Sequence, residues 1–100
     1  MEYKNLTTIE CHIIKAVINK CQTISEIRKF VRELISSKNM IASWSNDAFS
    51  SNIRNLCFKK ILTRKSDEFQ GGFFYGLNQE HLQLIIEYVN AFYKINEMGF

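Results

Sequence analysis

The sequence predicts a mainly helical α+β domain that carries one small β-hairpin, in the order helix, helix, helix, hairpin, helix. Two segments, Thr7-Thr8-Ile9-Glu10 and Thr23-Ile24-Ser25-Glu26, match the capping box that begins helices. Proline is absent, and three of the four glycines fall between residues 71 and 76, where a turn between strands is expected. Most other apolar residues recur with the spacing of an amphipathic helix.

The first two helices are predicted at about 7–20 and about 23–36. The apolar stripe of the first helix consists of Ile9, Ile13, Ala16 and Val17, and we also place Lys20 on it. The stripe of the second consists of Ile24, Ile27, Val31, Leu34 and Ile35. Both helices are therefore expected to pack one face against a shared core.

The connection to the third helix is about nine residues long, which exceeds the three or four residues of the tightest helix-turn-helix. Its first part, Ser36–Asn39, is a polar cluster typical of a break. For Met40–Trp44 two interpretations stay open, a strand that pairs with the hairpin or an ordered loop.

The third helix is predicted at about 45–60 and has two chemically distinct faces. Its apolar side consists of Phe49, Ile53, Leu56 and Cys57. The opposite side consists of Asp47, Ser51, Arg54, Asn55 and Phe58. Two strands, 61–65 and 73–77, should follow as a β-hairpin that spans about 61–77.

A final helix is predicted at about 78–96, with Asn78 as its N-cap. It carries a broad apolar stripe of Leu82, Ile85, Ile86, Val89, Phe92 and Tyr93. This helix is long for so small a domain.

Length and composition indicate one globular domain over residues 1–100, because 46% of the residues are hydrophobic. The net charge of +3 says little, but its distribution is informative. Five positive residues and no acid lie between Arg54 and Lys65. Three scattered cysteines favour a reducing compartment, and no leader or membrane span is evident. We therefore expect a cytoplasmic protein without a membrane partner.

Three helices followed by a two-stranded hairpin resemble the winged helix-turn-helix superfamily over about residues 6–78. The segment from Ser45 to Lys65 is similar to the recognition-helix pattern of small bacterial regulators of the MarR and PadR kind. The Phe58-Lys59-Lys60-Ile61 junction departs from that pattern, because those families usually place a glycine before the strand. The turn from helix to strand must therefore be made differently here.

The resemblance implies that the third helix reads the major groove of double-stranded DNA and that the hairpin is a wing. Arg54 can pair with guanine and Asn55 with adenine, whereas serines reach base edges or phosphates. The predicted DNA-binding residues are Arg28, Asn46, Ser50, Ser51, Arg54, Asn55, Lys59, Arg64, Lys65 and Gln70. Asp67 and Glu68 at the hairpin tip would repel phosphate. An exposed, solvated helix face and an ordinary surface hairpin are the alternative interpretation.

The final helix resembles the dimerising helix of PadR-like repressors and of TubR-like plasmid partition adaptors. We therefore predict a homodimer whose interface includes Leu82, Ile85, Ile86, Val89, Phe92 and Tyr93. Transcriptional repression is the leading role. The alternatives are an adaptor of a plasmid or phage partition or replication system, with a partner NTPase, and a winged-helix module that binds only protein.

Enzymatic function, a cofactor and a metal site are not expected. His12 and His81 lack the spacing to each other and to the cysteines that metal sites use. No phosphate-binding glycine loop, nucleophile elbow or paired-carboxylate motif is present. The aromatic residues around the hairpin and the final helix are expected to form core, with an interface or a small effector pocket as the alternative.

Overall fold

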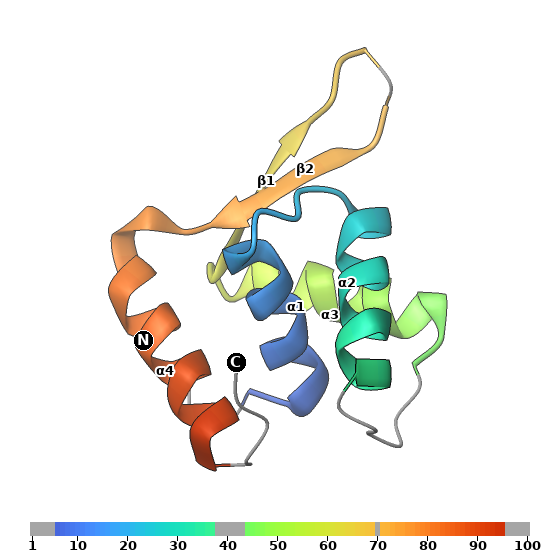
Figure 1. The fold of residues 1–100 in the computed structure, drawn as a ribbon. Helices are drawn as coiled ribbons and strands as arrows, with labels where there is room; N and C mark the ends of the chain where they lie inside the picture. Colours follow the sequence, from blue (N-terminus) through green and yellow to red (C-terminus); the bar gives the residue numbers. More distant parts are fainter. Residues whose placement is uncertain (1–5, 38–43, 70, 96–100) are drawn as a thin grey trace.

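A computed structural model describes residues 6–37, 44–69 and 71–95. The chain is mainly helical, with one two-stranded antiparallel sheet that projects beyond the helices (Figure 1). The elements are α1 (Thr8–Ile18), α2 (Ile24–Ser37), α3 (Asn46–Phe58), β1 (Leu62–Ser66), β2 (Phe73–Leu77), the short 3₁₀ helix η1 (Gln79–His81) and α4 (Leu82–Ile95). The predicted class and element order are confirmed at this level.

Helices α1, α2 and α3 begin where the sequence predicts, because their caps are local, whereas the last predicted helix begins with a 3₁₀ turn and α4 itself starts at Leu82. The Thr7 hydroxyl accepts a hydrogen bond from the backbone N–H of Glu10, and the Glu10 carboxylate accepts one from the N–H of Thr7. Thr23 and Glu26 make the same reciprocal pair at the start of α2. Asn78 caps η1, which runs directly into α4.

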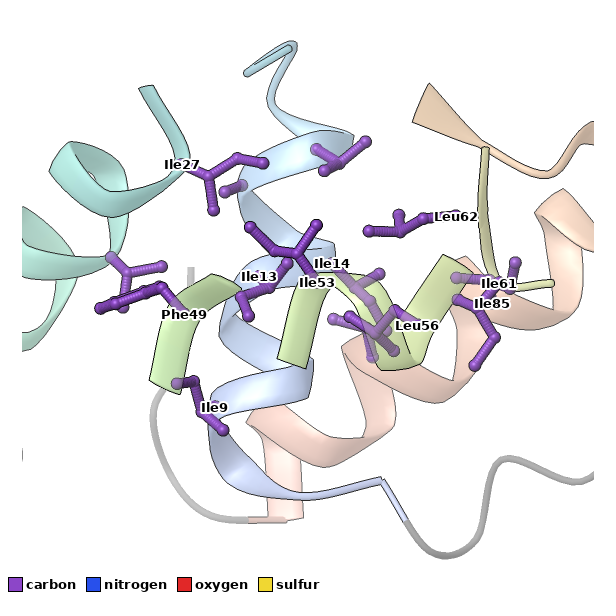
Figure 2. Packing of buried hydrophobic residues seen from close by; sticks show 14 of the residues in the cluster. Ile9, Ile13, Ile14, Ile27, Phe49, Ile53, Leu56, Ile61, Leu62 and Ile85 are labelled. Atoms are coloured by element: carbon purple, nitrogen blue, oxygen red, sulfur yellow. The ribbon is translucent and has the colours of Figure 1, made fainter. Parts of the chain in front are cut away.

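Helix α1 is the centre of the core, and α2, α3, α4 and β2 all contact it. Ile13 and Ile14 are both fully buried, with Ile53 and Leu56 of α3 packed against them (Figure 2). Burial on several sides goes beyond the single predicted stripe, and it includes the polar residues Glu10 and His12. The placement of Lys20 on that stripe is wrong, because this residue is exposed and lies after the helix.

Two helices end two residues earlier than predicted, each in a Schellman motif. At the end of α3, the N–H of Ile61 donates to the carbonyl of Leu56 and that of Lys60 to the carbonyl of Cys57. Lys60 has φ of 62°, in the left-handed region that usually holds glycine. Lys20 occupies the same position after α1, with φ of 76°. The glycine absent from the helix-to-strand junction is thus replaced by a strained lysine.

The hairpin is anchored to the helices at its base. Leu62 pairs with Leu77 at the base of the hairpin, and Ser66 with Phe73 near its tip. The N–H of Tyr75 donates to the carbonyl of Gln22, between α1 and α2, at 2.7 Å. The open question about Met40–Trp44 lies mostly outside the described residues; Trp44 itself is half-buried and stacks edge-on against His12.

Candidate nucleic-acid interface

Helix α3 is held rigidly by its inner face. The Ser45 hydroxyl accepts a hydrogen bond from the N–H of Ala48 at 3.1 Å and caps the helix. Phe49, Ile53 and Leu56 are buried in the core. The buried face fixes the rotation of the helix, so the direction of its outer face is fixed as well.

The outer face of α3 carries the polar residues that the sequence predicts there. Ser51, Arg54 and Asn55 are exposed, as are Asp47 and Phe58, and all five lie within about 100° of arc on a helical wheel. The predicted division of this helix into two faces is confirmed.

The other two predicted contacts on α3 lie at the edge of that face. Ser50 is half-buried. Asn46 is exposed, and its carboxamide oxygen accepts a hydrogen bond from Arg32 of α2 at 3.3 Å. Asn46 therefore ties the start of α3 to α2 in this structure. The bond between Arg32 and Asn46 was not predicted, because nothing local signals a contact between residues 14 positions apart.

The two basic residues of the hairpin point to opposite faces of the sheet, because neighbouring strand residues alternate. Arg64 shares its face with Tyr75, its partner on β2. Its guanidinium lies 4.4 Å from the centre of the Phe73 ring, in a cation–π contact. Lys65 pairs with Phe74 on the other face. Both side chains are exposed, and they project from opposite faces of the hairpin.

The hairpin tip is built around Asp67. Its carboxylate accepts a hydrogen bond from the N–H of Phe69 at 3.0 Å, and its carbonyl accepts one from Gly71. Gly71 and Gly72 have φ of 75° and 81°, which a residue with a side chain rarely adopts. Asp67 thus has a structural role that charge alone did not reveal. The predicted contact residue Gln70 lies outside the described residues.

Lys59 does not lie free for a phosphate. Its Nζ donates to Oε2 of Glu10 at 3.1 Å, and it joins the end of α3 to the start of α1. Glu10 is buried, so its charge requires this partner. The structure thus gives Lys59 an ion pair with Glu10, and the DNA contact at Lys59 stays a prediction.

At the start of α2, the Glu26 carboxylate accepts hydrogen bonds from the N–H groups of Gln22 and Thr23. These bonds hold the pKa of Glu26 below its usual value, so the group stays charged at neutral pH. An acid therefore occupies the N-terminal end of α2, where free N–H groups would otherwise suit a phosphate. Arg28, two residues further along α2, is half-buried.

A groove of about 620 Å³ lies between the end of α3 and β1. It is lined by Arg54, Cys57, Phe58, Leu62, Thr63 and Arg64. No acidic residue is among them, and the Phe58 side chain is 86% exposed. Sequence reasoning placed Phe58 on the outer face without assigning it to a site; the signal was an aromatic residue on an otherwise polar face.

Half of the predicted dimerisation residues belong to the core of the single chain. Ile85, Val89 and Tyr93 are buried against α1 and its neighbours, and Figure 2 shows Ile85 beside Ile61. Leu82, Ile86 and Phe92 are half-buried. A second copy could reach the first three only if they left the core, so they are better described as core residues.

Among residues 6–37, 44–69 and 71–95, no three histidine, cysteine or acidic side chains gather as a metal site would require. In the same ranges, no helix has the length and apolar character needed to cross a membrane. Comparison with protein families finds no family model that matches the chain, and no curated protein matches it.

Proposed function

We propose that the chain is a sequence-specific, double-stranded DNA-binding protein of the winged-helix type, with α3 as the recognition helix and the β1–β2 hairpin as the wing. One observation carries the proposal. A helix with a firmly buried inner face exposes Ser51, Arg54 and Asn55, and a projecting hairpin with exposed Arg64 and Lys65 follows it directly (Figure 1).

The chemistry of this surface suits DNA. The major groove admits one helix, and an arginine binds guanine O6 and N7 through two parallel hydrogen bonds. Arg54 has that role in the proposal, Asn55 pairs with adenine, and Ser51 binds a base edge or a phosphate. Arg64 and Lys65 bind backbone phosphates from the two faces of the wing.

A regulator that reads a two-fold operator acts as a dimer, and α4 offers a surface for it. Leu84, Tyr88, Ala91 and Ile95 follow one another at steps of four, three and four residues, which is the spacing of a coiled-coil seam. Leu84 and Ile95 are prominently exposed. In the dimer that we propose, this outer stripe forms the interface in place of the buried residues. We assign transcriptional repression as the role of this dimer.

The test begins with selection of a preferred duplex from a random-sequence library, followed by measurement of affinity at several salt concentrations. Arg54→Lys keeps the charge and loses the paired hydrogen bonds, so affinity for the preferred duplex should fall by about 1–3 kcal/mol while affinity for unrelated DNA changes little. Lys65→Ala should weaken binding to both DNAs and lower the salt slope by about one.

Lys94→Ala is the matched control, because it removes a positive charge from the exposed side of α4. It should leave both affinities unchanged. Absence of binding at low salt, or binding that does not weaken as salt rises, would show that the surface does not bind DNA. Cooperative binding of several dimers to adjacent repeats would favour a partition or replication adaptor over a transcriptional repressor.

A further inference from the structure

The groove between α3 and β1 combines an exposed aromatic ring with two arginines, whereas a phosphate contact needs only the arginines. Phe58 is 86% exposed at the groove, with Arg54 one turn before it on the same helix. An aromatic ring this open offers a flat apolar face on which a base can stack. Two arginines and no acid line the same groove, so an anion is favoured there.

The facing wall is held in place by aromatic packing. The Arg64 guanidinium lies 4.4 Å from the centre of the Phe73 ring, and that ring lies 6.4 Å from the ring of Tyr75. Tyr75 is in turn fixed by its backbone hydrogen bond to Gln22. An arginine ordered in this way presents a flat, charged surface on which a base can stack.

We infer that this groove binds an unpaired nucleobase of DNA, stacked on Phe58, with its phosphate at Arg64. The inference rests on the proposed function and adds a second ligand class to it. If α3 lies in the major groove and the hairpin follows the backbone beside it, the groove faces the strand between them. A base that leaves the stack at a kink, bulge or mismatch in that strand would enter the groove.

The experiment compares two DNAs that carry the same preferred sequence, one fully paired and one with a single unpaired base at the position that the wing flanks. Stacking on one aromatic ring should make the wild-type protein bind the bulged DNA roughly 5- to 150-fold more tightly. Phe58→Ala should bring this ratio close to one and leave affinity for the paired duplex within about twofold. Phe58→Trp should keep the ratio.

The matched control is Phe69→Ala, because Phe69 is 97% exposed and lies at the hairpin tip, away from the groove. It should leave the ratio unchanged. In addition, the fluorescence of Phe58→Trp, after subtraction of the Trp44 signal of the wild type, should fall when bulged DNA is added and stay constant with paired DNA.

Equal affinity of the wild type for the two DNAs, with binding to both, would overturn this inference and leave the proposed function intact. Failure to bind either DNA would remove both. A nucleoside monophosphate that quenches Phe58→Trp at micromolar concentration would also overturn it, because the groove would then be a site for free nucleotides.

Discussion

The Nζ atom of Lys59 lies 3.1 Å from Oε2 of Glu10, so a cation at the end of α3 is bound to a buried carboxylate in the first turn of α1. The Glu10 side chain is 2% exposed and that of Lys59 is 38% exposed. The same carboxylate accepts hydrogen bonds from the N–H and the hydroxyl of Thr7. One acid thus caps α1 and fixes α3 to it.

Lys59→Met should therefore destabilise the fold by about 1–3 kcal/mol, because it leaves a buried carboxylate without its counter-charge. Urea unfolding measures the change in free energy. Glu10→Gln in the same background should recover part of the loss, since an uncharged glutamine can still complete the capping box. Lys65→Met, which removes an exposed hairpin cation, should change stability by less than about 0.5 kcal/mol. Equal losses for the two lysines would contradict the role of the ion pair.

Replacing Lys20 or Lys60, whose backbones have positive φ, with glycine should increase stability. Glycine at Lys20 or at Lys60 relieves the steric cost of positive φ, about 1–2 kcal/mol, but it adds freedom to the unfolded chain. Each substitution should stabilise the protein by about 0.5–1 kcal/mol, and the two should add because the sites lie at different helix ends.

Asn19→Gly is the control for this pair. Asn19 precedes Lys20 and has φ of −86°, so glycine relieves no strain there and removes the bond from its side chain to the Lys15 carbonyl. Thermal unfolding of the three variants measures these changes, and Asn19→Gly should destabilise the protein. A loss of stability in both lysine variants would mean that the lysine side chains contribute more than their backbone strain costs.

The features predicted from sequence are the local ones. A capping box involves residues three positions apart, and a hairpin needs glycines between two short apolar strands, so both are visible in one stretch of chain. The starts of α1 and α2 and both strands were found in this way. The two faces of α3 were also predictable, because helical spacing alone separates them.

The features that sequence did not reveal depend on residues far apart in the chain. Glu10 and Lys59 are 49 positions apart, and no pattern links them. The burial of α1 on several sides follows from how many elements surround it, which one stripe cannot indicate. The stripe of α4 has the same difficulty, since apolar residues that face the core and those that would face a second copy have equal hydrophobicity.

His12 predicts a pH dependence of stability. It is buried, it is hydrogen bonded to Tyr93 through Nδ1, and no described residue bonds to its Nε2. Burial lowers the pKa of His12 from 6.5 to about 4. Between these values the unfolded chain binds a proton that the folded chain does not, so stability is complete above pH 6.5 and is lost as the pH falls toward 4.

The free energy of unfolding should therefore fall by about 2 kcal/mol between pH 7.5 and pH 5, where ordinary carboxylates remain mostly charged. Urea unfolding at a series of pH values measures it. His12→Gln should remove most of this slope even if it lowers stability throughout, whereas His81→Gln should retain it, because His81 is only half-buried. A slope that persists in His12→Gln would assign the effect to other groups.

The outer stripe of α4 predicts how the chain associates. If Leu84 and Ala91 lie in a seam between two copies, a lysine at either position places a charge in an apolar interface, and light scattering should show a monomer where the wild type is a dimer. The thermal midpoint of the monomer should fall, because dimerisation stabilises the folded state by mass action. Asn90→Lys adds the same charge to an exposed position away from the stripe and should remain dimeric. A wild-type monomer at micromolar concentration would remove the dimer from the proposal, and with it the expectation of a two-fold operator. The proposed contact between α3 and DNA would then be that of a single copy.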